Sequence, residues 1–147
     1  MIEALRARPE ILAVNLHSAL GRFPPQPAAG DDQPGRLPDL PRYLRAFDFA
    51  VSAAGYNSFH ELAQSELPTL VVVQMTAEMD DQGARARHAE AAGWAIDASG
   101  IAAAELPAAI DRITDPEAQR AMRFNARRQP LGNGAGDAAA LVAAFAR

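Results

Sequence analysis

The sequence contains neither cysteine nor lysine. Without cysteine, the chain cannot form a disulfide, bind a metal through thiolates or use a thiol nucleophile. All 14 basic residues are arginine, which excludes a phosphate-loop lysine, a Schiff-base lysine and a lysine general base. No apolar run approaches the roughly 18 residues that a membrane-spanning helix requires. No basic run exists in this chain of net charge −4, so we expect no nucleic-acid partner.

The length and composition of the chain are typical of an ordinary globular domain. The chain has 147 residues, of which 49% are apolar and 22% charged, and this length is typical of one domain. Such a chain can bury about 68–70% of its unfolded surface, which is enough for a hydrophobic core. The first ten residues, MIEALRARPE, are a charged helical segment and not a signal peptide. A cytoplasmic location is therefore the default expectation.

Short apolar runs alternate with helical patterns, which favours an α/β fold with helices on both faces of a parallel sheet. We expect a Rossmann-like three-layer sandwich whose short, mostly parallel sheet has about four strands. The expected strands are residues 11–15 (buried), 49–52, 69–73 and 94–97. The expected helices are residues 1–8, 40–47, 58–65, 82–92 and 116–128, with two more built on Leu106, Ile110 and Ile113 and on Ala138, Leu141, Val142 and Phe145. Residues 21–41 hold six prolines and are expected to form an irregular loop.

Residues 54–61, Ala-Gly-Tyr-Asn-Ser-Phe-His-Glu, join an expected strand to a helix. Gly55 allows a sharp turn after the strand, and the free N–H groups of the following helix start can receive a phosphate. Glu61, one turn further on, can accept hydrogen bonds from two neighbouring hydroxyls of a ribose. A structural alternative is that Ser58 and Glu61 form a capping box, in which both side chains satisfy the helix start. The residues alone leave both interpretations open.

A second polar segment, residues 74–82, follows the most strand-like run of the chain. It begins with Gln74 and ends with Asp81 and Gln82, where the next helix starts. A carboxylate beside an amide offers the acceptors and donors that suit sugar hydroxyls. The alternative, that Asp81 is simply the N-cap of this helix, is the one that the residues alone favour.

Other residues of chemical interest have structural interpretations. None of the three histidines has metal-ligand spacing, so we expect no metal site. Trp94 and Phe124 are expected in the core. Arg123, Arg127 and Arg128 are expected to form a solvated helix face, and docking against another domain or a membrane surface is the alternative.

Taken together, residues 52–93 resemble the donor-binding C-terminal domain of two-domain GT-B glycosyltransferases. The nearest group is the N-acetylglucosaminyltransferases that make lipid II in peptidoglycan synthesis, with their relatives. The resemblance extends from Leu40 to the C-terminus. The family patterns S/G-x-G-x-x-T/S-x-x-E, apolar-Pro, D-Q-x-x-N-A and A-G are matched by Ser52, Gly55, Ser58, Glu61, Leu67, Pro68, Asp81, Gln82, Ala86, Ala92 and Gly93.

The resemblance implies a UDP-sugar as the substrate, with no further cofactor. Glu61 would hold the donor ribose, while Gly55 and the helix start at Ser58 would face the diphosphate. Asp81 and Gln82 would contact hydroxyls of the transferred sugar. The donor-binding residues expected from the resemblance are Gly55, Asn57, Ser58, Glu61, Gln74, Asp81 and Gln82.

The chain also departs from the family pattern. Arg85 stands where the family has Asn, and Glu66 where it usually has Gly. The family's opening strand with its Gly-rich loop, and its acceptor-binding N-terminal domain, have no counterpart. We therefore expect residues 1–147 to be an N-terminally incomplete donor domain, inactive alone. An acceptor domain or a separate partner chain would complete the enzyme and provide any peripheral membrane association.

Two other functions are compatible with the residues. One is a nucleotide-sugar 2-epimerase, which shares this architecture, although residues 74–78, Gln-Met-Thr-Ala-Glu, differ from the T-E-R-P-E-like pattern that this group usually has at the corresponding place. The other is a non-catalytic interaction module, because an incomplete sheet leaves an unpaired edge that a partner must cover.

Overall fold

The computed structural model describes residues 1–16, 32–35, 37, 39–73, 81–129 and 134–145. The strands are β1 (Val14–Leu16), β2 (Asp32–Gly35), β3 (Ala50–Ser52), β4 (Thr69–Val71) and β5 (Ala95–Asp97). The α-helices are α1 (Ile2–Arg6), α2 (Tyr56–Gln64), α3 (Gln82–Ala91), α4 (Leu106–Thr114), α5 (Pro116–Arg127) and α6 (Ala135–Phe145). Two 3-10 turns, η1 (Leu40–Arg42) and η2 (Leu44–Ala46), precede β3.

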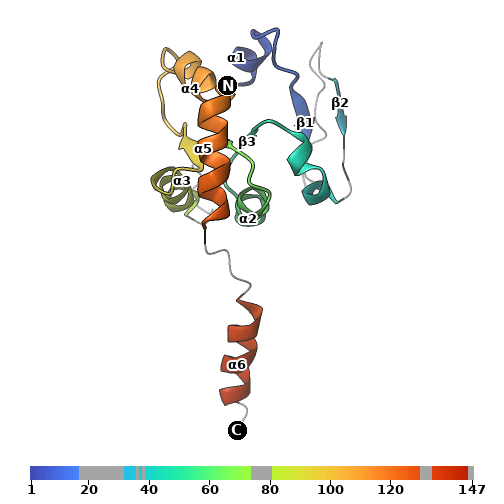
Figure 1. Cartoon of the computed structure of the whole chain (residues 1–147), viewed down its shortest axis with the longest axis vertical. Coiled ribbons are helices and arrows are strands. Elements are labelled where there is room, and N and C mark those ends of the chain that lie inside the picture. Colours follow the sequence, from blue (N-terminus) through green and yellow to red (C-terminus); the bar gives the residue numbers. More distant parts are fainter. Residues whose placement is uncertain (17–31, 36, 38, 74–80, 130–133, 146–147) are drawn as a thin grey trace.

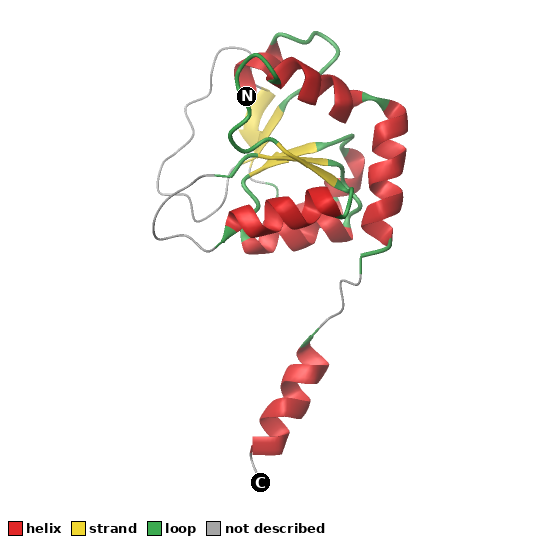
Figure 2. Cartoon of the chain, turned by 90° about the vertical axis from the view of Figure 1, so that its left-hand side faces the viewer, coloured by secondary structure: helices red, strands yellow, loops and turns green. Residues whose placement is uncertain are grey.

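The main sheet is three-stranded and parallel, with the strand order β3-β4-β5. Helix α2 connects β3 to β4, and α3 connects β4 to β5, so the chain follows a βαβαβ path. Figure 2 shows helices above and below these strands. The expected α/β architecture with a short parallel sheet is therefore confirmed.

Alternate residues of the strands supply two separate layers of core. Val71 and Ala95 pack with the buried side chains of α2 and α3. Leu70 and Ile96 point to the other face, where they pack with α4 and with Met122 of α5. Both faces of the sheet are covered, which explains why the strands read as continuous apolar runs and not as alternating ones. On the α2 side, Trp94 is buried and its ring meets that of Phe59 edge-on.

The first expected strand does not join this sheet, so the main sheet has three strands where about four were expected. Instead β1 pairs in parallel with β2, and the two form a separate two-stranded sheet. Strand β2 lies inside residues 21–41, which were expected to be irregular throughout. In the sequence, Pro34 argues against a strand here. An edge strand nevertheless tolerates proline, because one side of its backbone is unpaired. The strand β1 is not buried either, since Val14 is 40% exposed.

The helix expected at residues 40–47 is present as η1 and η2. Asp39, with a φ of 57°, turns the chain into η1, where Pro41 has the first-turn position that suits its fixed φ. Within the two turns only Leu44 is buried. One buried contact holds a short turn in place but does not support a longer helix.

Helix α5 closes the amino-terminal edge of the main sheet. The guanidinium of Arg123 donates hydrogen bonds to the carbonyl oxygens of Phe47 and Asp48, which precede β3, at 3.3 and 3.0 Å. It also donates to the carbonyl of Glu66, which precedes β4, at 3.3 Å. One side chain therefore fixes the entrances of two neighbouring strands, and Figure 1 shows α5 lying across the front of the sheet.

Strand β5 is held to α5 in the same way, by a side chain that donates to a backbone carbonyl. The side-chain amide of Asn125 donates to the carbonyl of Gly93, just before β5, at 3.0 Å. Gly93 has a φ of +74°, and a Cβ there would lie 2.7 Å from Nδ2 of Asn125. This position requires glycine for both its conformation and its space. The expected end of helix α3 at Gly93 is thus confirmed, with a tertiary contact in addition.

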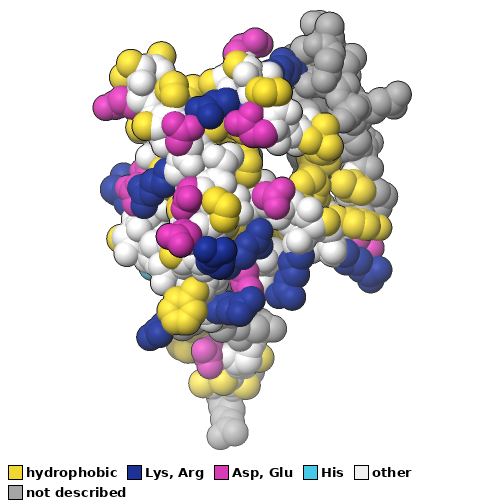
Figure 3. Space-filling model, turned by 45° about the horizontal axis from the view of Figure 1, so that its top comes forward, with side chains coloured by type: hydrophobic (Ala, Val, Ile, Leu, Met, Phe, Trp, Pro, Cys, Tyr) yellow, Lys and Arg dark blue, Asp and Glu magenta, His cyan; other side chains and the backbone are white. Residues whose placement is uncertain are grey.

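The outer face of α5 differs from the expectation in two ways. Phe124 is 57% exposed, not in the core, and the guanidinium of Arg128 lies over its ring, 5.5 Å from the centroid. Arg127 pairs with the Glu66 carboxylate at 2.6 Å, so only part of the arginine face is simply solvated. Figure 3 shows basic and acidic side chains interspersed on this side of the molecule.

Helix α6 stands away from the other elements in Figures 1 and 2. Its apolar residues have the expected helical spacing, yet Leu141 and Val142 are exposed and Phe145 is 84% exposed. None of the described helices has the length and apolar character needed to cross a bilayer.

We predict that Arg123→Met lowers the free energy of unfolding by about 1–3 kcal/mol, because three carbonyl groups lose their charged donor. Chemical denaturation monitored by circular dichroism measures this loss. The matched control is Arg120→Met on the same helix, which removes only an exposed pair with Glu117 at 3.7 Å and should cost less than about 1 kcal/mol. Equal losses for the two variants would contradict the role given to Arg123.

Candidate functional site

The start of α2 lies at the carboxyl end of β3, the edge where open α/β sheets bind ligands. Gly55 is the N-cap residue, and no side chain in the described part of the chain caps this helix start. The first helical hydrogen bond runs from the Phe59 N–H to the Gly55 carbonyl at 2.8 Å. The N–H groups of the first turn precede this bond, so they have no partner within the helix and can serve a ligand.

The capping box, which was the structural alternative for Ser58 and Glu61, is not formed. The helix begins two residues before Ser58, which places that residue inside the first turn instead of at the N-cap. Neither Ser58 nor Glu61 caps the helix, because the chain turns at Ala54 and Gly55 and enters the helix directly. The structural alternative for these side chains is therefore removed.

The turn itself is built differently from the expectation. Gly55 has an ordinary φ of −57°, whereas Ala54 has a φ of +57°, which is rare for a residue with a Cβ. A Cβ added at Gly55 would meet nothing within 4 Å. The glycine thus leaves open space beside the helix start, and the sharp turn is made by the preceding alanine.

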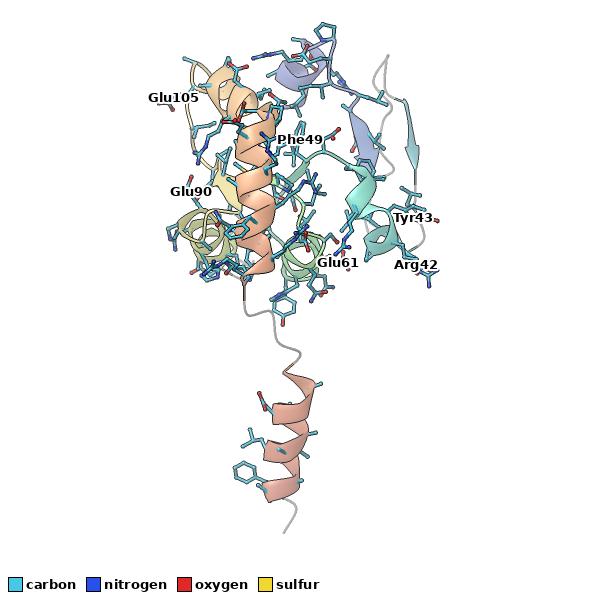
Figure 4. The ribbon with its side chains drawn as sticks, in the orientation of Figure 1. Arg42, Tyr43, Phe49, Glu61, Glu90 and Glu105 are labelled. Carbon is cyan, nitrogen blue, oxygen red and sulfur yellow. The ribbon has the colours of Figure 1, made fainter. Side chains whose placement is uncertain are left out.

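Glu61 has an unused carboxylate. Its side chain is half-buried, and within the described residues it makes no hydrogen bond or ion pair. Asn57 and Ser58, one turn earlier on the same helix, are exposed. Figure 4 shows Glu61 on α2, while Glu90 and Glu105 lie on other parts of the molecule. No group of three or more metal-ligating side chains exists among the described residues.

The start of α3 is capped by a side chain, unlike the start of α2. The Asp81 carboxylate accepts a hydrogen bond from the Ala84 N–H at 2.8 Å, so the N-cap interpretation is confirmed. Gln82 is only 3% exposed. The contacts of Asp81 and Gln82 with a sugar stay predictions. Gln74 lies outside the described residues.

One hydrogen bond brings the two helix starts together. The Arg85 side chain, in the first turn of α3, donates from Nε to the carbonyl of Ala54 at 2.8 Å. Gly55 and Asp81 thus belong to the same edge of the sheet, as expected from the parallel strands. Sequence reasoning did not include Arg85 in the site. Its departure from the family asparagine was the available signal.

A shallow hollow on the described surface lies away from these helix starts. Its volume is about 210 Å³, and it is lined by Ala63 and Gln64 of α2 and by Ala126 and Arg127 of α5. This position is at the amino-terminal edge, next to the pair between Arg127 and Glu66. We give it no role in ligand binding, because the helix starts that can receive an anion point away from it.

A short parallel sheet with helices on both faces and an uncapped helix start at its carboxyl edge defines a Rossmann-like ligand-binding domain. The family model of the glycosyltransferase family 28 C-terminal domain matches residues 37–142. The chain therefore belongs to this family of glycosyltransferase domains. Neither the curated proteins nor the solved structures give a significant match.

We predict that Asp81→Ala lowers the free energy of unfolding by about 0.5–2 kcal/mol, because the start of α3 loses its capping acceptor. Thermal and urea denaturation measure this change. Asp81→Asn is the control, since an asparagine oxygen can accept the same hydrogen bond from Ala84. Unchanged stability in Asp81→Ala would show that the cap contributes nothing.

Proposed function

We propose that this chain binds the nucleotide-sugar donor of a hexosyltransferase, with a UDP-sugar as the ligand and an N-acetylglucosaminyl group as the first candidate. The family match supports a donor-binding domain of a glycosyltransferase. The observation that carries the proposal is the pairing, on one short helix, of an uncapped start with a half-buried carboxylate that has no partner among the described residues.

The diphosphate would lie at the start of α2. The first-turn N–H groups and the positive end of the helix favour an anion there. The space beside Gly55 lets phosphate oxygens approach the backbone without meeting a side chain. When the bond to the sugar breaks, negative charge grows on the departing diphosphate, and donors already oriented toward it lower the barrier.

The ribose would lie further along the helix, at Glu61. A carboxylate accepts hydrogen bonds from two vicinal hydroxyls, and both of its oxygens are available. Because this side chain is already half-buried, part of its desolvation cost has been met by folding. The distance along the helix from Gly55 to Glu61, six residues at about 1.5 Å each, is close to 9 Å, which suits a ribose attached to a diphosphate.

We expect Glu61→Gln to weaken UDP binding tenfold or more, about 1.4 kcal/mol, because one oxygen acceptor becomes a donor. Isothermal titration calorimetry with UDP and UDP-sugars measures the change. Glu117→Gln is the matched control, since it removes the same charge from an exposed position at the start of α5. Unchanged affinity in a folded Glu61→Gln variant would remove Glu61 from the site.

We also propose that the donor domain works with an acceptor-binding partner, either another domain or a separate chain. The exposed apolar side chains of α6 support this, because a soluble protein rarely leaves such a row uncovered. A transferase needs a second surface to hold the acceptor near the bound donor, and proximity of this kind contributes strongly to the rate.

Without its partner, the chain should self-associate through α6. We predict concentration-dependent association in size-exclusion chromatography with light scattering, and its reduction in the double variant Leu141→Ser/Val142→Ser. Serine at these exposed positions changes the apolar surface without touching the core. A wild-type chain that stays monomeric at all concentrations would argue against an obligate partner.

A further inference from the structure

The bond between α3 and the turn before α2 has a consequence for the donor site. We propose that Arg85 is the positioning residue of this site: its guanidinium holds the Ala54 peptide in place and thereby orients the first turn of α2. The proposal rests on the donor function proposed above. It assigns a role to a residue that differs from the asparagine of the family pattern.

The turn that leads into α2 has an unusual backbone conformation. Ala54 has a φ of +57°, and a residue with a Cβ in this region is strained and persists only where its surroundings impose the conformation. Its side chain is 1% exposed and belongs to the core. The residue cannot relax toward solvent, so the polar groups of its backbone must be held by neighbours.

Two side chains hold the polar groups of the Ala54 backbone. The Ala54 N–H has a long hydrogen bond of 3.4 Å to the Ser52 hydroxyl. Its carbonyl has the stronger contact, the part-buried bond of 2.8 Å from Nε of Arg85, and a bond from a charged donor is about twice as strong as a neutral one. Arg85 is therefore the main restraint on the peptide that leads into Gly55.

The restraint on Ala54 affects the start of α2. Gly55 is both the N-cap of α2 and the acceptor of its first hydrogen bond, from Phe59. No side chain among the described residues caps this start, so the orientation of the Gly55 peptide depends on the residue before it. If Arg85 releases Ala54, the first turn of α2 loses its fixed direction, and the N–H groups proposed to hold the diphosphate lose theirs.

The test compares Arg85→Met with wild type in two measurements. Amide hydrogen exchange by NMR in the free protein should show exchange at Phe59 at least tenfold faster in the variant. Ser65, which donates to Glu61 at the other end of α2, is the internal control and should be unchanged. Calorimetry should show UDP affinity reduced tenfold or more.

Rescue separates positioning from a merely structural role. Glycine adopts a positive φ without steric cost, so Ala54→Gly combined with Arg85→Met should recover most of the UDP affinity and of the Phe59 protection. A double variant no better than Arg85→Met would overturn the proposal. If Arg85→Met does not fold, Arg85→Lys takes its place, because a single ammonium lacks the guanidinium geometry. Unchanged exchange at Phe59 in that variant would also overturn the proposal.

The two proposals fail in different ways. A wild-type chain that binds neither UDP nor a UDP-sugar overturns the donor function, and with it the site that Arg85 would position. A wild-type chain that binds UDP, with an Arg85→Met variant that binds it equally well and exchanges Phe59 at the same rate, overturns the role of Arg85 alone.

Discussion

The hydrogen bonds from α5 to the amino-terminal edge of the sheet are the constraint on which the remaining architecture depends. Arg123 reaches the backbone before β3 and β4, and Asn125 reaches the backbone before β5. The strands have only three residues each, so their own ladder bonds hold them weakly. A single helix that binds all three entrances fixes their alignment, and the carboxyl ends follow from it.

The two edges of the sheet differ in whether side chains satisfy their backbone groups. At the amino-terminal edge, charged and amide donors from α5 satisfy the backbone carbonyls. At the carboxyl edge, the start of α3 is satisfied by Asp81, whereas the start of α2 is not satisfied by any described side chain. The edge with unsatisfied backbone donors is the one that can bind an anion, which agrees with the membership in a glycosyltransferase family.

Two residues near this edge contribute to the fold in opposite ways. Ala54 fills the core, makes the turn and offers its carbonyl to Arg85, so the strained conformation has packing on one side and a charged donor on the other. Glu61 is the opposite case, because its carboxylate contributes no described contact to the fold. A half-buried charge without a structural partner is costly, which is understandable when the group serves a ligand.

The class of fold, the helices around the main sheet and the sheet edge that holds the starts of α2 and α3 could be predicted from the sequence, because apolar periodicity, Gly93 and the Asp81 cap are local signals. The sequence also determined that Trp94 would be buried. Only the tertiary structure decided that β1 pairs with β2 outside the main sheet, that Phe124 is exposed and that α6 lies free of the core. These outcomes depend on which surfaces pack against each other, and secondary-structure propensity does not specify this. The bond from Arg85 to Ala54 joins residues 31 positions apart, so it too could be found only in three dimensions.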